Sequence, residues 1–145
     1  MNKKFKLEKV LELREKALER EKIKLADLQL KEKQAKEEMT AVMEDIKVKN
    51  RELEQDRAKG LFDFIEMYSK YIAVRQNDLL LCEAKVQMAA KEVAKQKEIL
   101  KKSLNDVKVM EKLKAKHLLD YAEYVKKQEM IQIDEINITR GYKEE

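Results

Sequence analysis

The chain has 145 residues, of which 43% are charged, and its mean hydropathy is −0.72. It contains no proline or tryptophan and only two glycines, which is typical of long solvated helices and excludes a thick globular core. The 33 basic and 29 acidic residues give a net charge of +4 and are mixed along the whole length, so no basic stripe for nucleic acid is present. We therefore expect an all-α protein with a narrow apolar seam and no enclosed active site.

The first predicted helix runs from about Phe5 to about Arg57. Its apolar residues recur every seven positions with one polar interruption, and such a repeat holds one face of a helix against a partner helix. The positions at this spacing are Leu11, Leu18, Leu25, Glu32, Met39, Ile46 and Leu53. Arg14 and Glu21 interrupt the companion positions, so we expect loose pairing near the start of this helix.

The second predicted helix runs from about Leu61 to about Ile138 and carries an unbroken ladder. That ladder comprises Ile65, Ile72, Leu79, Val86, Val93, Leu100 and Val107. The first ladder would reach position 60, whereas the second begins at position 65, so the two seams lie about 140° apart on one straight helix. The chain must therefore reverse, and Gly60, within a predicted turn at 58–61, suits a left-handed helix end.

These patterns predict a long antiparallel two-helix coiled-coil hairpin over residues 1–145, a single unit in which the second helix is the longer one. With the turn centred near residue 59, Leu7 would lie opposite Glu111, and the chain beyond Lys114 would have no intramolecular partner. A hairpin is a monomer of 17.2 kDa. The alternative is a generic structural spacer or adaptor that forms a parallel homodimer.

No catalytic, metal or cofactor site is predicted. The sequence has no glycine-rich phosphate loop, no cysteine pair at metal spacing and no nucleophile beside a base. Cys82 is the only cysteine and falls on the inner face, where a thiol packs as a small apolar group. His117 and Asp120 share one helix face, but the seam position of His117 favours packing over metal binding. We also expect neither a signal peptide nor a membrane span.

Half of the eight Phe and Tyr residues fall within ten positions after the predicted turn. We define the aromatic stripe as Phe64, Tyr68, Tyr71 and Arg75. An apolar stripe wider than its own partner helix can cover is a candidate protein-binding surface with aromatic and arginine anchors. The alternative is that these rings cap the hairpin as a small local core. A second candidate surface on the predicted overhang includes Tyr121 and Tyr124.

Three parts of the chain together resemble a known family. They are the start Phe5–Arg14, the block from Phe64 through Arg75 to Val86, and the ending with Gln128–Met130 and Ile133–Ile136. With the chain length and the unequal helices, they resemble the flagellar export protein FliJ and its type III secretion relatives. Coiled-coil sequences share many features, so the resemblance rests on the combination and not on any one segment.

The resemblance implies a cytosolic, non-enzymatic stalk component of the flagellar type III protein-export apparatus, at the inner face of the cell membrane. Its partners would be the hexameric export ATPase, the cytoplasmic domain of the membrane export gate, and export chaperones. The end with both termini would enter the ATPase, and the hairpin end would contact the gate. No nucleic acid, cofactor or membrane insertion is implied.

The family's gate-contact positions fall on the aromatic stripe, and a second part of that surface falls on Val42, Asp45 and Lys49. The family pattern has a small residue and a histidine where Tyr71 and Arg75 stand here. It has aromatic residues where this chain has Asp45 and Lys49, so these details of the contact differ.

Overall fold

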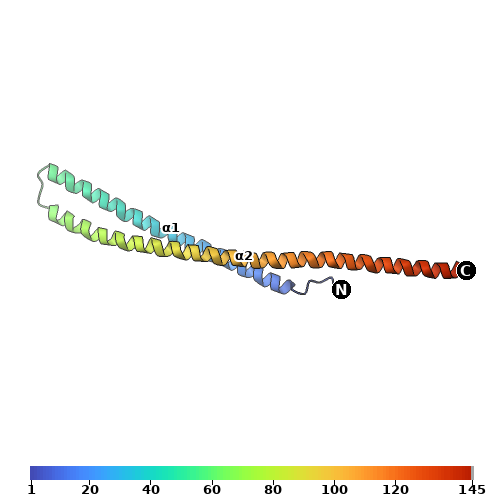
Figure 1. Ribbon diagram of the computed structural model, residues 1–145. Coiled ribbons are helices and arrows are strands. Elements are labelled where there is room, and N and C mark those ends of the chain that lie inside the picture. The colour runs from blue at the N-terminus through green and yellow to red at the C-terminus, as the bar shows by residue number, and fades with distance from the viewer. Residues whose placement is uncertain (145) are drawn as a thin grey trace. The chain divides into compact units, whose positions relative to one another are not determined.

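The computed structural model consists of two helices, α1 (Glu8–Ala58) and α2 (Ile65–Glu144), packed antiparallel as a hairpin (Figure 1). The structure describes the backbone of residues 1–144 and the side chains of residues 1–141. α1 has 51 residues and α2 has 80, so the predicted all-α hairpin with a longer second helix is confirmed. Neither helix, over the described residues, has an apolar stretch long enough to span a membrane.

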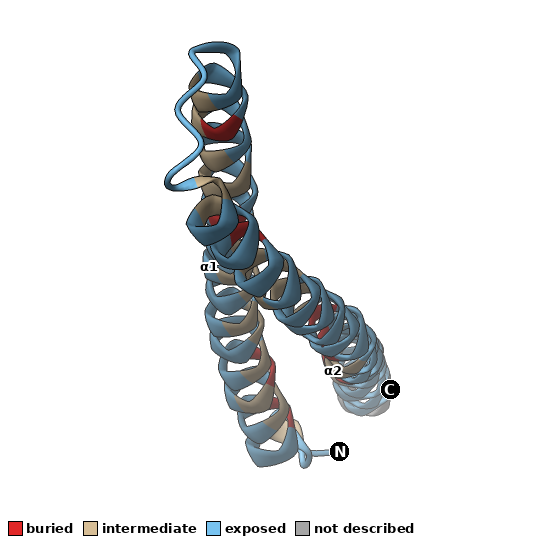
Figure 2. Ribbon diagram, turned by 90° about the vertical axis from the view of Figure 1, so that its left-hand side faces the viewer, coloured by how far each residue is buried: buried red, intermediate tan, exposed pale blue. Residues whose placement is uncertain are grey.

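The two heptad ladders form the packed faces of the helices. Every position of both ladders is buried or half-buried. The buried apolar side chains are Leu11, Leu18, Val42, Leu53, Ile72, Val93, Val107 and Met110. Figure 2 colours the buried residues red, and they form short stretches along both helices. Burying a Leu or Val side chain contributes about 1.5–3 kcal/mol, so this thin seam provides most of the stabilisation.

The contacts divide the chain into two compact units, each made from one stretch of each helix. The terminal unit comprises Met1–Arg20 and Lys101–Glu145, and the connection unit comprises Glu21–Leu100. In the terminal unit, Glu8 forms an ion pair with Lys114 (2.9 Å) and the Phe5 ring lies 5.8 Å from that of His117. The predicted register pairs Glu8 with Met110. The observed partner of Glu8, Lys114, lies further along α2 towards its C-terminal end. His117 thus has a partner within the chain, beyond the limit predicted at Lys114.

α1 ends in a Schellman motif at the predicted glycine. Gly60 has a φ of +73°, in the left-handed region. The Leu61 N–H donates to the Asp56 carbonyl (2.8 Å) and the Gly60 N–H donates to the Arg57 carbonyl (3.1 Å). These two bonds satisfy carbonyls that the helix end would otherwise leave without partners.

The connection between the helices covers residues 59–64, whereas a turn at 58–61 was predicted. α2 begins at Ile65 because Phe62 to Phe64 first form a single tight turn, in which the Ile65 N–H donates to the Phe62 carbonyl (3.4 Å). The first α-helical bond runs from the Tyr68 N–H to the Phe64 carbonyl (3.0 Å).

The most buried side chain of the seam is polar. Gln96 is 2% exposed, and its amide donates to the Glu21 carboxylate and to the Glu21 backbone carbonyl (3.2 Å for the second bond). Arg14 also reaches across the seam and donates to the Asp106 carbonyl (3.5 Å). The prediction of loose pairing is wrong at Glu21, because the Gln96 side-chain amide donates a hydrogen bond to the Glu21 carboxylate. A polar pair of this kind favours the one register in which both partners meet.

We predict that Gly60→Ala lowers the free energy of unfolding by about 1–2 kcal/mol, because an L-residue is strained at this φ. A Cβ at Gly60 would meet no atom within 4 Å, so the effect comes from the backbone alone. Gly141 has equally open surroundings but lies within α2, so Gly141→Ala should be neutral or stabilising by up to about 1 kcal/mol. Urea unfolding followed by circular dichroism measures both. Equal destabilisation by the two substitutions would refute the role given to Gly60.

A second prediction concerns the polar pair of the seam. Gln96→Leu should destabilise the hairpin by about 1–3 kcal/mol, because the half-buried Glu21 carboxylate loses its hydrogen-bond donor. Replacing both residues with leucine should recover most of this loss. A double-mutant cycle in urea measures the coupling between the two side chains. A coupling free energy near zero would show that the pair does not set the register.

Candidate protein-binding surface

The aromatic stripe lies at the start of α2, in the connection unit. Ile65 and Ile72 of the ladder face α1, so the residues next to them in helical projection lie beside the seam. Phe64 is 58% exposed and Tyr71 is 40% exposed. Tyr68 and Arg75 are half-buried. The stripe therefore has two members open to a partner and two that pack partly against α1.

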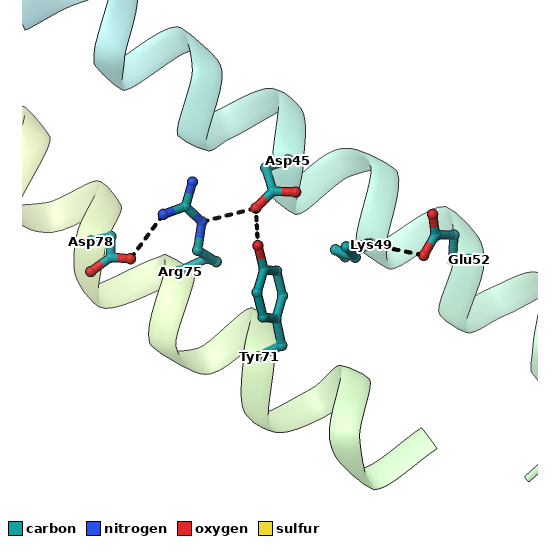
Figure 3. A network of polar contacts seen from close by, with 6 residues as sticks. All are labelled: Asp45, Lys49, Glu52, Tyr71, Arg75 and Asp78. Carbon is teal, nitrogen blue, oxygen red and sulfur yellow. Dashed lines mark hydrogen bonds and ion pairs between the residues drawn. The ribbon is translucent and has the colours of Figure 1, made fainter. Parts of the chain in front are cut away.

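Two residues of the stripe are bound to one carboxylate on α1. The Tyr71 hydroxyl donates to Asp45 Oδ2 (2.5 Å), and Arg75 Nε donates to the same oxygen (2.9 Å) (Figure 3). A second Arg75 nitrogen donates to Asp78 (3.0 Å), one turn further along α2. We call these four residues the Asp45 cluster. It joins α1 to α2 beside the apolar seam.

Lys49 extends this polar group along α1. Its ammonium lies 5.8 Å from the centre of the Tyr71 ring, within the range of a cation–π contact. The same ammonium forms an ion pair with Glu52 (3.3 Å), and this hydrogen bond raises the pKa of Lys49. Asp45 and Lys49 thus make polar and cation–π contacts with Tyr71.

The Asp45 cluster fixes the ionisation of its members. The hydrogen bond from Tyr71 lowers the pKa of Asp45, and Arg75 adds to this effect, while partial desolvation opposes it. The pKa of Tyr71 is raised, first because its proton is shared with the Asp45 carboxylate. The pKa of Tyr68 is raised mainly by desolvation. At neutral pH the cluster therefore holds an ionised Asp45, a neutral Tyr71 and a charged Arg75.

Val42, a tentative member of the surface, is a seam residue. It is only 7% exposed and packs between the helices, so little of its side chain is open to a partner. A shallow groove beside it is lined by Ala41, Val42, Leu81 and Cys82, with Arg75 and Asp78 of the Asp45 cluster at its border. The free thiol of Cys82 is half-buried, as a packing role requires.

The second candidate surface lies on α2 in the terminal unit, beyond the contact with α1. Tyr121 is half-buried and Tyr124 is 37% exposed. Every described side chain from 126 to 141 is exposed. His117 packs against Phe5, and its buried Nε2 has no hydrogen-bond partner. Among the side chains described, no group of three or more His, Cys, Asp or Glu is placed to hold a metal ion.

Leu61 and Met67 are not members of the predicted aromatic stripe, yet they are 55% and 59% exposed. Leu61, Phe62 and Phe64 belong to the connection and Met67 to the first turn of α2, so four large apolar side chains lie in and just after the connection. The available signal was the run Leu61–Phe64, since connections are usually polar. The heptad pattern instead predicts Leu61 and Phe62 in the first turn of the second helix.

The family of the chain follows from one comparison. A model of the family described as Flagellar FliJ protein matches residues 3–145, nearly the entire sequence. The chain belongs to the FliJ family. Comparisons with curated proteins and with solved structures gave no match. Membership confirms the resemblance. The chain is therefore a component related to flagellar protein export. Its family is one of structural components and not of known enzymes.

We predict that the Asp45 cluster makes stability depend on pH. The folded-state pKa of Asp45 is lower than that of an unfolded aspartate, about 3.9, so ionised Asp45 stabilises the hairpin at neutral pH. This contribution to the free energy of unfolding is complete above the pKa of Asp45 in the unfolded state. It is lost as the pH falls through the lower pKa of Asp45 in the folded state. Asp45→Asn should therefore lose less stability than the wild type between about pH 6 and pH 3.

Tyr71→Phe provides the matched comparison, because it removes the largest cause of the lowered pKa and keeps the ring. It should show a pH dependence between those of the wild type and Asp45→Asn. Urea unfolding at each pH measures all three proteins. Identical losses in the wild type and Asp45→Asn would mean that Asp45 does not contribute in this way.

Proposed function

We propose that this FliJ-family protein is a non-enzymatic stalk component of the flagellar type III export apparatus. It links the hexameric export ATPase to the cytoplasmic domain of the membrane export gate and handles export chaperones. It acts as a monomer in the cytoplasm, at the inner face of the cell membrane at the flagellar base. The proposal is supported by the family match over residues 3–145 and by the intramolecular hairpin.

The observation that carries the gate contact is the exposure of aromatic side chains beside the connection. Phe64 and Tyr71 are 58% and 40% exposed although both flank the buried seam. Exposed aromatic residues at the centre of a surface are the side chains that most often supply binding free energy. The aromatic stripe, Phe64, Tyr68, Tyr71 and Arg75, is therefore the proposed gate-binding site.

The terminal unit is the proposed ATPase-binding part. α2 continues as a single helix beyond His117, and a single helix is the narrowest element that can enter a ring. Leu118 and Leu119 on this stretch are 49% and 68% exposed, so both present apolar surface to a partner. Tyr121 and Tyr124 follow one turn later and belong to the same proposed surface.

We predict that Phe64→Ala combined with Tyr71→Ala abolishes binding to the purified gate domain and leaves the helical content nearly unchanged. Two lost anchors should cost about 2 kcal/mol or more each, or about thirtyfold in affinity for each. The seam residues Ile65 and Ile72 are untouched, so the hairpin should remain folded. Calorimetry with the gate domain and circular dichroism measure the two quantities.

The matched comparison is Leu118→Ser combined with Leu119→Ser in the terminal unit. This variant should keep gate binding and lose stimulation of the ATPase. Full gate binding by the Phe64/Tyr71 variant, with its fold intact, would remove the stripe as the gate site. Equal loss of both activities in both variants would argue against separate binding surfaces.

A further inference from the structure

The segment ahead of α1 contacts α2 in the terminal unit. We define the strap as residues 1–7, which precede the first residue of α1, Glu8. Phe5 is half-buried, whereas the other residues of the strap are exposed. The Phe5 ring lies 5.8 Å from the His117 ring, with 44° between the two planes, which is a tilted packing of the kind that aromatic rings prefer. The strap therefore covers part of α2 with the Phe5 side chain.

A backbone hydrogen bond and an ion pair hold Phe5 at this place. The Glu8 N–H donates to the Phe5 carbonyl (3.2 Å), which ties the strap to the first turn of α1. The Glu8 carboxylate forms an ion pair with Lys114 (2.9 Å), which lies one turn before His117 on α2. We call the Phe5–His117 contact together with this ion pair the closure. It joins the strap, the start of α1 and α2.

The closure contains a polar atom without a partner. His117 Nε2 is buried and makes no hydrogen bond with any of the residues that the structure describes. A buried polar atom in this state is less stable than the same atom in water or beside a polar partner. This penalty offsets part of the stabilisation that the packing of Phe5 provides. Opening the closure would allow Nε2 to form a hydrogen bond.

Like charges also oppose the closure. Residues 1–7 carry three basic and no acidic side chains, a net charge of +3, and residues 111–117 carry three basic side chains and one acidic, a net charge of +2. The ion pair of Glu8 with Lys114 compensates for one of these charges. The remaining repulsion acts between solvated groups and is therefore screened by salt. The closed state is thus only marginally favoured over an open one.

The closure borders the proposed ATPase-binding surface. Leu118 and Leu119 follow His117 directly, and Tyr121 lies one turn after His117 on the same face of α2. A partner that packs on this surface meets Phe5 at its edge. His117 can offer Nε2 to such a partner only after Phe5 has moved away.

We propose that the strap is autoinhibitory. In the free protein Phe5 covers His117 and competes with the ATPase for this face of α2. Binding of the ATPase displaces the strap and gives His117 Nε2 a hydrogen-bond partner. The inference rests on the proposed function and adds a means of regulating the same surface.

The test measures how strongly the full chain stimulates the purified export ATPase at increasing concentration. Phe5→Ala weakens the closure from the strap, and Glu8→Gln weakens it from α1. Each should lower the half-maximal concentration by about threefold or more, because a larger fraction of the protein is then in the open state. Leu13→Ala is the matched control, since Leu13 lies on α1 in the same unit and is 65% exposed. It should stay within about twofold of the wild type.

A fluorescent reporter follows the strap itself. The chain has no tryptophan, so Phe5→Trp places a single indole against His117. Added salt should shift its emission in the free chain to shorter wavelength, because screening of the lysines strengthens the closure. The ATPase should shift it to longer wavelength, after subtraction of the emission of the ATPase alone, because the strap is displaced into water. Circular dichroism checks that every variant is folded.

Each outcome decides for or against the strap. A raised half-maximal concentration for Phe5→Ala would make Phe5 a contact of the ATPase, and an unchanged one would make the strap a plain end of the seam. Either result, or indole emission that stays the same when the ATPase binds, would overturn this inference alone. Absence of stimulation by the wild type would overturn the proposed ATPase contact and, with it, the inference.

Discussion

A seam one side chain wide holds α1 against α2, and the other properties of the protein depend on it. Each helix contributes one apolar residue per heptad with a companion from the neighbouring row, and most other described positions are exposed. Two helices that meet along such a line bury only a narrow row of side chains, and Gln96 is the one buried polar residue among those described. The exposed faces of the helices therefore carry most of the polar side chains, which suits a family of structural export components.

The connection decides which apolar groups the seam can use. The Schellman motif at Gly60 ends α1, and α2 starts again only at Ile65. Everything between them, including Leu61 and Phe62, lies outside the reach of the seam. Large apolar side chains are therefore left exposed at the connection, while the ladder residues on either side are covered.

Polar groups at the seam give specificity that an apolar ladder alone lacks. Heptads that differ only in Leu, Ile and Val tolerate a shift of seven residues, since each knob then enters an equivalent hole. The Glu21–Gln96 pair and the Asp45 cluster are each satisfied in one register only. Such pairs add little net stability, yet a displaced register would leave their charges unpaired.

The sequence by itself determined the helices, the hairpin and the glycine that ends α1. Heptad periodicity is a local property of the chain, and a mismatch between two ladders can be read without knowing any contact. The family, too, was visible as the combined resemblance of three segments. The aromatic stripe can be located from the sequence because the apolar residues after the turn occupy a wider arc of the helix than one partner helix can cover.

Only the tertiary structure decided which residues meet across the seam and which side chains stay exposed. Gln96 is the most buried side chain among the described residues and is bound by Glu21, whereas Arg75 is half-buried and bound by Asp45 and Asp78. Their partners depend on where α2 begins, and a shift of the connection by a few residues changes every cross-helix pair. That start is set by hydrogen bonds of the connection, which periodicity does not encode.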